Sequence, residues 1–471
     1  MTLPLLIAAL CYVAALMAFS WYARRTTSRD ARGYLFAGGN LSAFLGLFTF
    51  AATLFSTFTL LGMPDFFRTH GVGAWLFLGF SDLLMVFGII WLGLQLRRRR
   101  PEGGYQGMAR LMITAYRRPL AGWVCLGGAF LFLIPYVAIQ IRGVAIFLHG
   151  SFPTGLPVWG WAVGMVVLML VYSETGGLKA IIYSDVLQGI LLLTIIWLIG
   201  ANCLGELGGW QAMFAEVEKV DAALLSTPGP KGLFTPQFML ASFLAIALIP
   251  YTQPQVSTRI MIMRSRQALF RMALGVGIFA ILVILPTLFL GMYGAVHYAG
   301  AETSVFLSGT LVGDQSPVVA ALAMIGLIAA AISTADSQLF ALGSELKPLL
   351  GGSEEDRLRW ARLAIALFAG LALAFSLVAS DELVLLARTS FAGTALLAPM
   401  IFVGLLGRQP PPAWLPGLTL AALLVFLGVS LGYLPGVWLG LRADLWLMGG
   451  LSLAALATRP WLGTRAPVED G

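Results

Sequence analysis

The chain has 471 residues, of which 59% are hydrophobic and only 11% are charged. Soluble globular domains carry about 25% charged residues, so the composition excludes that class and predicts an all-α polytopic membrane protein. The formal net charge is +7, and the three cysteines lie singly in apolar runs, which argues against a disulfide framework or a cysteine metal centre.

Thirteen apolar runs are long enough to cross a bilayer, at residues 3–22, 41–64, 72–96, 119–148, 157–173, 178–204, 236–258, 268–296, 316–344, 360–380, 383–406, 412–433 and 443–457. The first run has Arg24 and Arg25 behind it and no basic segment before it, so we expect a retained helix rather than a cleaved signal peptide. With the N-terminus outside and the C-terminus inside, all but six of the 29 Lys and Arg fall on the inner side, as the positive-inside rule requires.

The runs group into two units of similar length. Residues 38–205 hold five runs that start inside, and residues 236–406 hold five that start outside, so the two units are predicted to be inverted repeats. Residues 1–30 add one helix before them, and residues 206–235 form an outer loop that we expect to be partly helical and amphipathic. Residues 410–471 add two helices and a short cytoplasmic tail.

Each unit opens with a run that is predicted to be interrupted. The first reads AATLFSTFT at residues 51–59 and is followed by Gly62 and Pro64, and the second reads PYTQP at residues 250–254. Proline removes a backbone donor and clashes with the preceding turn, so it interrupts a helix. Paired interruptions in inverted halves indicate the central site of a transporter, although chance proline kinks are the alternative.

A polar stretch, IAAAISTADSQLFAL at residues 328–342, lies in one of the most apolar parts of the chain. At 3.6 residues per turn, one helix face carries Ala330, Ser333, Thr334 and Ser337, with Asp336 beside it. Hydroxyls and a carboxylate at membrane depth predict an oxygen-lined site for a small hard cation. The alternative is close helix packing, for which small residues suffice, but packing does not require the acid.

Four stretches resemble the sodium:solute symporter family: FAGGNLSAF from Phe36, AATLFSTFTLLGMPDFFRTHG from Ala51, VYSETGGLKAIIYSDVLQG from Val171 and AAAISTADSQL from Ala329. The order and spacing of these stretches fit across residues 30–410. The resemblance implies the leucine-transporter fold, with one helix before a ten-helix core and here two after it. It also implies sodium-coupled uptake of a small organic solute by alternating access, with Na⁺ as the coupling ion and no organic cofactor.

The resemblance also implies two sodium sites. The shared site would use backbone carbonyls of Ala52, Phe55 and Ala330 and the hydroxyls of Ser333 and Thr334. A second site, which some members of the family have, would use Asp185, Ser333, Asp336 and Ser337. Several of those members have Ser or Thr where this chain has Asp336, so the extra acid could strengthen the site, bind a proton or pair elsewhere. Asp185 could instead pair with Lys179 or Tyr183 near the inner surface.

The solute is expected between the two interruptions, near the midplane. The residues predicted to line its cavity are Ser56, Thr57, Thr59, Asp82, Gln140, Tyr251 and Gln253. Arg142 and Arg388 could bind a carboxylate on the solute, since a guanidinium binds one bidentately. The alternatives are that Arg142 extends outward to the membrane surface and that Arg388 pairs with Asp381 or Glu382. This mixture fits an amino acid or small carboxylate slightly better than a sugar.

Other classes of protein fit less well. An enzyme would need clustered catalytic groups, and the three histidines are isolated, so we expect no enzyme activity. A proton-coupled symporter on the same fold is the nearest alternative, and a transporter-like sensor input module is another. We expect a multi-pass protein of the plasma (inner) membrane that works as a monomer, with a small-molecule solute and the lipid bilayer as partners and no nucleic acid.

Overall fold

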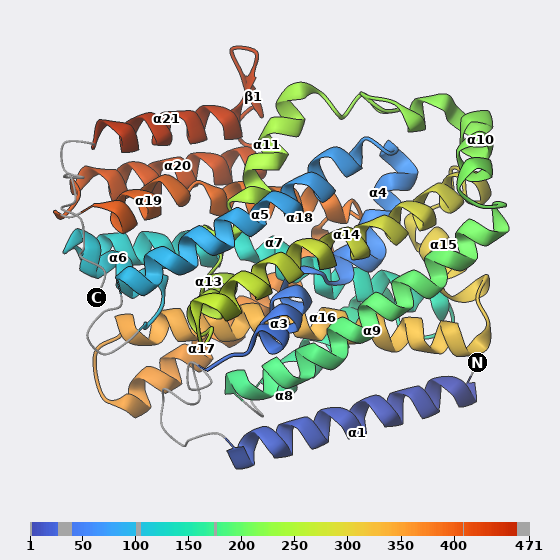
Figure 1. Cartoon of the computed structure of the whole chain (residues 1–471), viewed down its shortest axis with the longest axis horizontal. Coiled ribbons are helices and arrows are strands. Elements are labelled where there is room, and N and C mark those ends of the chain that lie inside the picture. Colours follow the sequence, from blue (N-terminus) through green and yellow to red (C-terminus); the bar gives the residue numbers. More distant parts are fainter. Residues whose placement is uncertain (1, 27–39, 100–104, 174–176, 408, 459–471) are drawn as a thin grey trace.

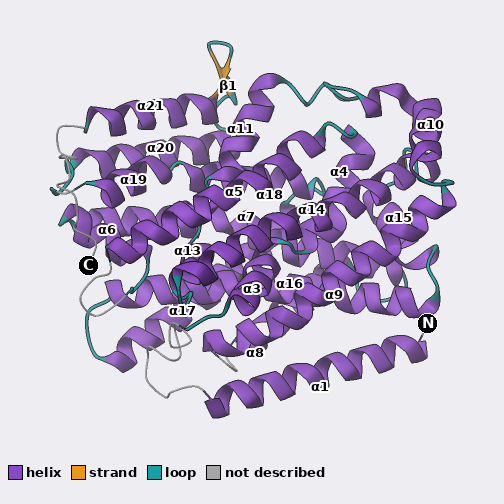
Figure 2. Cartoon of the chain, viewed as in Figure 1, coloured by secondary structure: helices purple, strands orange, loops and turns teal. Residues whose placement is uncertain are grey.

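The structure is a computed structural model that describes residues 2–26, 40–99, 105–173, 177–407 and 409–458. The start of the FAGGNLSAF stretch, residues 174–176 of the stretch that begins at Val171, and the C-terminal tail therefore lie outside the described residues. Within them the chain is almost entirely helical, with one short hairpin of β1 (Val437–Trp438) and β2 (Leu441–Arg442) (Figure 2).

The helices run side by side across the molecule, with α1 along one edge and α21 along the opposite edge (Figure 1). The longer helices are α1 (Thr2–Thr26), α5 (Ala74–Arg98), α7 (Pro119–Ser151), α8 (Val158–Ser173), α9 (Gly177–Glu206), α14 (Arg266–His297), α16 (Pro317–Leu346), α17 (Glu354–Val378), α18 (Leu383–Ala395), α20 (Trp414–Ser430) and α21 (Ala443–Ala457). The shorter ones are α3 (Ala43–Leu54), α4 (Met63–His70), α6 (Met108–Tyr116), α10 (Trp210–Asp221), α11 (Pro236–Ala247), α12 (Ile249–Thr252), α13 (Pro254–Met261), α15 (Thr303–Ser308) and α19 (Ala398–Leu406).

Seven helices in the described ranges are long and apolar enough to cross a membrane, or eight if the bent pair formed by residues 43–54 and 58–70 counts as one span. Each of the thirteen predicted runs coincides with one of the helices or with a broken series of them. Several of these helices are shorter than a full span, so the number of thirteen crossings stays a prediction.

Helix starts follow local sequence signals. Ser316 caps α16 by accepting a hydrogen bond from the Val319 N–H, and Pro317 occupies the first helical position, where no backbone donor is needed. Ser265 caps α14 in the same way. These caps fix where the long apolar helices begin.

The first interruption lies between α3 and α4. Helix α3 ends at Leu54, and Phe55 is extended, with φ −91° and ψ 111°. Beyond it the Ser56 hydroxyl accepts from the Phe58 N–H, and the Thr59 hydroxyl accepts from the Ser56 N–H. Such side-chain bonds to the backbone compete with helical bonds, so a polar segment breaks the helix here, and the two halves are bent by 58°.

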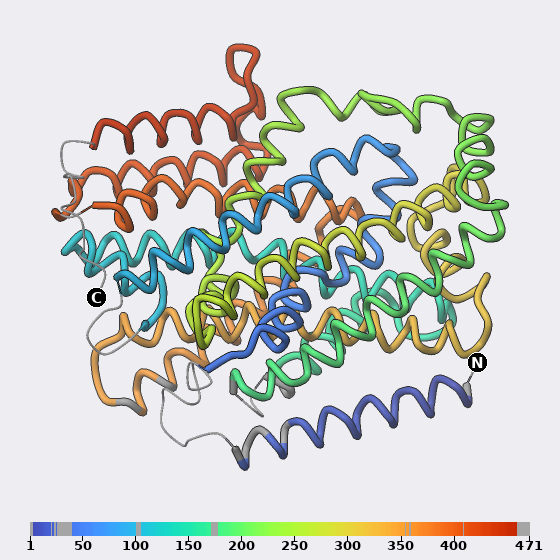
Figure 3. The backbone as a smooth tube through the Cα atoms, viewed as in Figure 1, coloured from blue at the N-terminus to red at the C-terminus, as the bar shows by residue number. Residues whose placement is uncertain are grey.

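The second interruption lies between α12 and α13, as the PYTQP sequence predicts. Gln253 is extended, with φ −106° and ψ 117°, and Pro254 has no N–H to continue the ladder. The tube in Figure 3 shows α3 and α13 close together beside α16. The contacts between helices agree, because α16 packs against α9, α7 and α1 and also against both α3 and α13. Both broken helices therefore meet the helix that carries the polar stretch.

The loop predicted at 206–235 contains α10, followed by a short 3-10 turn at Ala222–Leu225. Helix α10 buries Met213 and Val217 while Glu216 and Lys219 form an exposed ion pair, so it is amphipathic as expected. It packs against α14.

Candidate functional site

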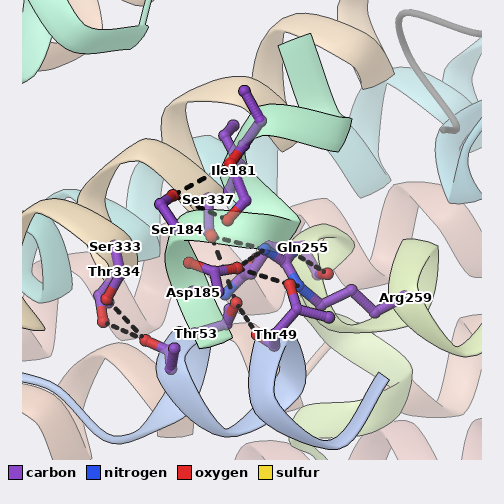
Figure 4. A network of polar contacts seen from close by, with 12 residues as sticks. Thr49, Thr53, Ile181, Ser184, Asp185, Gln255, Arg259, Ser333, Thr334 and Ser337 are labelled. Carbon is purple, nitrogen blue, oxygen red and sulfur yellow. Dashed lines mark hydrogen bonds and ion pairs between the residues drawn. The ribbon is translucent and has the colours of Figure 1, made fainter. Parts of the chain in front are cut away.

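The polar stretch of α16 meets α3 at the last turn before the first interruption. The Ser333 hydroxyl lies 3.1 Å from the Ala52 carbonyl oxygen and 3.0 Å from that of Ala330, and the Thr334 hydroxyl lies 3.0 Å from the Ala52 carbonyl (Figure 4). All four residues are buried. Four of the five residues predicted for the shared sodium site are therefore in mutual contact.

Phe55, the fifth, is buried and directly follows the end of α3. Because the chain leaves the helix here, none of the described backbone or side-chain hydrogen bonds ends on its carbonyl oxygen. Three carbonyls and two hydroxyls provide five neutral oxygens, which suits a monovalent hard cation better than a divalent one that prefers carboxylates. The hydroxyl protons can rotate away, so that the lone pairs of Ser333 and Thr334 face an ion.

A buried arginine lies next to this cluster. Arg259, from α13, places Nη2 3.2 Å from Asp185 Oδ2 and 2.6 Å from Ser337 Oγ, and its Nε lies 2.9 Å from Thr49 Oγ1. The Thr49 hydroxyl donates to Asp185 Oδ2 at 2.5 Å, and Arg259 Nη1 donates to the Gln255 carbonyl (Figure 4). The side chains of Arg259 and Asp185 are 2% and 0% exposed, so this is a fully desolvated ion pair.

Sequence reasoning missed this role of Arg259, because it grouped the residue with the basic residues of the inner surface. Lys179 and Tyr183 were considered as alternative partners of Asp185. In the structure Asp185 instead bonds to Arg259 and Thr49. A usable signal existed: Arg259 lies within the short polar half-helix PQVSTRIM after the second interruption, where a membrane-embedded charge implies a partner.

Asp336 has a different environment. It is fully buried, and no described residue provides a hydrogen-bond partner for either carboxylate oxygen. Asp185 Oδ1 likewise lacks a described partner. Of the residues predicted for the second sodium site, Asp185 and Ser337 are joined through Arg259, whereas Ser333 bonds to the carbonyl of Ala52.

Four of the residues predicted to line the solute cavity gather at the first interruption. The Thr57 N–H donates to Gln140 Oε1 at 3.2 Å, and Ser56 and Thr59 bond to the same backbone segment. Tyr136, one turn before Gln140 on α7, donates its hydroxyl to the Leu54 carbonyl at 2.8 Å. Tyr136 was not predicted, although its position four residues before Gln140 places it on the same helix face.

Two predicted residues lie at the second interruption. Gln253 is fully buried, and its Oε1 accepts from Gln255 Nε2. Tyr251 packs its ring against Trp91 and Phe402, with centroids 5.7 and 4.7 Å away. These three rings line a groove of about 660 Å³ that also includes the exposed Phe87, so Tyr251 faces the flank of the bundle rather than the segment near Thr57.

Asp82 lies on the face of α5 that packs into the bundle, in register with the buried residues Leu78, Met85 and Ile89. It is 8% exposed, and no hydrogen bond or ion pair joins its carboxylate to another described residue. Helix α5 packs against α12 and α13, the helices on either side of the second interruption. Among the predicted solute residues, Asp82 is the one that carries charge.

Both arginines considered for a solute carboxylate have partners within the protein. Arg142 pairs with Asp381 at 2.7 Å and donates to the Ser376 carbonyl. Arg388 pairs with Asp444 of α21 and donates to Ser242, so the predicted alternative of Asp381 or Glu382 as its partner was wrong. Asp444 is 56 residues further along the chain, and no local pattern indicates that pairing.

Residues 34–346 match the family model described as the sodium:solute symporter family. The chain is 24% identical over 339 residues to a sodium/pantothenate symporter of Haemophilus influenzae, a match that covers 68% of this chain and 66% of the relative. A sodium/pantothenate symporter of Escherichia coli is 22% identical over 64% of this chain and 60% of its own length. The chain thus spans less than two thirds of these relatives. An uncharacterized symporter of Bacillus subtilis is 24% identical over 87% of this chain and 84% of its own.

Two solved structures share the arrangement of helices. A Na⁺-coupled sialic acid symporter in a substrate-bound outward-open state superposes with a TM-score of 0.76, covering 97% of this chain and 98% of that one at 16% identity. A nucleobase-cation-symport-1 family transporter gives a TM-score of 0.56 at 12% identity, covering 91% and 94%. At these identities the likeness shows the fold, which is the leucine-transporter fold.

Proposed function

The chain belongs to the sodium:solute symporter family, and from this premise we propose that it uses Na⁺ to drive uptake of a small organic solute by alternating access. The observation that carries the proposal is the contact of the Ser333 and Thr334 hydroxyls with the Ala52 carbonyl, at the end of α3. The names of the relatives, which refer to pantothenate and sialic acid, support a small organic solute.

Sodium and solute are linked through one short segment of backbone. Phe55 would offer its carbonyl to the ion, and two residues later Thr57 bonds to Gln140 in the region proposed for the solute. An ion that fixes the conformation of Phe55 also fixes Thr57, so each ligand favours the binding of the other. Such coupling is reciprocal, and a coupling free energy of about 1–3 kcal/mol corresponds to roughly 5- to 150-fold in affinity.

The two five-helix units at 38–205 and 236–406 would be the inverted halves of the transporter, and each interruption would lie in the first helix of its unit. We propose that the solute binds near Ser56, Thr57, Asp82 and Gln140. Transport of one charge through 100 mV supplies about 2.3 kcal/mol. At about 1.4 kcal/mol per tenfold, that drives roughly fifty-fold accumulation of a neutral solute.

A second sodium ion at Asp185, Ser333, Asp336 and Ser337 stays a proposal. Asp336 supports it, because a fully buried carboxylate without a partner among the described residues is unfavourable at membrane depth unless a cation or proton accompanies it. Arg259 limits it, because its guanidinium already bonds to Asp185 and Ser337. An ion here would therefore bind on the Asp336 side of the cluster.

Reconstituted vesicles test the proposed coupling. Uptake of a solute found by a thermal-shift screen should follow an imposed inward Na⁺ gradient and should stop when K⁺ replaces Na⁺ at equal ionic strength. Uptake that follows an inward proton gradient with no requirement for Na⁺ would favour the proton-coupled alternative instead.

A further inference from the structure

Asp82 on α5 is a buried acid at membrane depth. It lies on the inward face of a membrane helix, is 8% exposed, and has no hydrogen-bond or ion-pair partner among the described residues. Removing an ionised carboxylate from water without a counter-charge is strongly unfavourable, so acids at membrane depth are normally paired or bind a ligand. Its environment therefore favours a cation or a proton beside the carboxylate.

Its position ties it to the solute region rather than to the lipid. The lipid-facing residues of α5, such as Phe80 and Phe87, are more than half exposed, whereas Asp82 is in register with buried residues. Helix α5 packs against α12 and α13, which lie on either side of the second interruption. Asp82 is therefore on a helix that borders the region proposed for the solute.

The protein provides cations elsewhere but not for Asp82. Arg142 pairs with Asp381, Arg388 pairs with Asp444, and Arg68 pairs with Asp65 and donates to the carbonyls of Tyr298 and Ala301. Each of these arginines, which a solute carboxylate would need, is already neutralised. Among the described residues proposed to line the solute cavity, the charge that remains without a partner is negative.

Uncharged groups around the interruptions are also compatible with a donor-rich ligand. Thr57 Oγ1 and Gln255 Oε1 are buried acceptors without a described partner, and Gln253 Nε2 is a buried donor without one. An ammonium group offers three donors and no acceptor, so it needs a carboxylate and neutral oxygens around it. Gln253 Nε2 could donate a hydrogen bond to a second polar group of the same solute.

We propose that the transported solute carries a protonated amine, and that this ammonium forms an ion pair with Asp82. This inference rests on the proposed function, because it concerns the solute of the same symport cycle. It narrows the expected solute from an amino acid or small carboxylate to an amine-bearing compound. A carboxylate without an amine would meet like charge at Asp82, while Arg68, Arg142 and Arg388 already have acidic partners.

Thermal unfolding of the purified full chain in detergent, with Na⁺ present, tests the proposal. The probes are α-amino acids, their N-acetyl derivatives, the corresponding α-hydroxy acids, and the corresponding amines without a carboxylate. We expect raised melting temperatures with amine-bearing probes alone, since N-acetylation removes the positive charge. A probe without an amine that stabilises the protein, or the lack of a shift with every amine-bearing probe, would overturn the proposal.

Two variants distinguish a specific loss of solute binding from a general loss of folded protein. Asp82→Asn keeps the size of the side chain and should weaken binding of the best amine about tenfold or more, because it removes one member of a buried charge pair. Glu216→Gln removes an exposed acid that pairs with Lys219 on α10 and should leave that binding unchanged. Equal affinity in Asp82→Asn and native protein contradicts the inference. Loss of the Na⁺-dependent shift in native protein contradicts the proposed function itself.

Discussion

Arg259 and Asp185 form an ion pair with 3.2 Å between Nη2 and Oδ2, in which both side chains are almost completely buried. The pair joins α13, the second half of the second broken helix, to α9. Thr49 bonds to both residues and adds α3, and Ser337 adds α16. One guanidinium thus joins both broken helices to α9 and α16, and these bonds must change if α3 and α13 move relative to those helices during transport.

Breaking this pair on one side should destabilise the fold. Asp185→Asn leaves the Arg259 charge buried without its counter-ion, and we expect a loss of about 3–5 kcal/mol in the free energy of unfolding. The double variant Asp185→Asn with Arg259→Gln removes both charges and should recover part of that loss. Chemical unfolding in detergent measures these free energies for the native protein, the two single variants Asp185→Asn and Arg259→Gln, and the double variant. Strictly additive effects would show that the two residues do not interact.

The shared sodium site should respond to loss of one hydroxyl. Thr334→Ala removes one of five proposed oxygen ligands, so the Na⁺ concentration for half-maximal uptake should rise several-fold while the amount of folded protein stays similar. Thr419→Ala is a matched control, because its hydroxyl is equally buried but bonds within α20 to the Leu415 carbonyl. An unchanged Na⁺ dependence in Thr334→Ala, measured as initial uptake into vesicles, removes Thr334 from the site.

The solute region should respond to crowding at Gly143. A Cβ there would lie 2.4 Å from Thr57 Cγ2, so Gly143→Ala must displace either Thr57 or α7, the helix that carries Gly143. We expect solute uptake to fall by about tenfold or more while the Na⁺-dependent rise in melting temperature remains, since tight packing transmits small shifts to bound groups. Gly127→Ala lies on the same helix, with nothing within 4 Å of the added Cβ, and should behave like the native protein. Unimpaired uptake in Gly143→Ala would place the solute elsewhere.

The ion-to-solute ratio tests the second sodium site. Asp336→Asn is the better variant for this purpose, because Asp185 also neutralises Arg259 whereas Asp336 has no described partner to lose. If a second Na⁺ binds there, the variant should lower the number of Na⁺ ions carried per solute by one, measured from the voltage at which net flux reverses in vesicles. A ratio that stays the same would mean that Asp336 does not bind a transported sodium ion.

The sequence predicted the parts that depend on local chemistry. Pro254 and the polar segment around Ser56 interrupt their helices for reasons that act within a few residues, and both interruptions are present. The hydroxyls of Ser333 and Thr334 could be assigned because the family resemblance named their partner, Ala52. Their mutual contact then depends only on the register of two helices.

Other features depend on tertiary packing and could not be predicted. A residue next to an interruption can face either side of its helix, so Tyr251 was assigned to the solute although it faces Trp91 and Phe402. The pairing of Arg388 with Asp444 joins helices far apart in the chain. Arg259 was misjudged because counting charges by membrane side does not report depth, and its burial is visible only once α9, α13 and α16 are assembled.

Sodium-dependent thermal unfolding of the purified protein, without any solute, tests the central claim most directly. Replacing K⁺ by Na⁺ at constant ionic strength should raise the melting temperature, because Na⁺ at about 100 times its dissociation constant adds about 2.7 kcal/mol to the native state. The same exchange should have no effect on the double variant Ser333→Ala with Thr334→Ala. An equal rise in the double variant, or no Na⁺-specific rise in the native protein, would contradict the account.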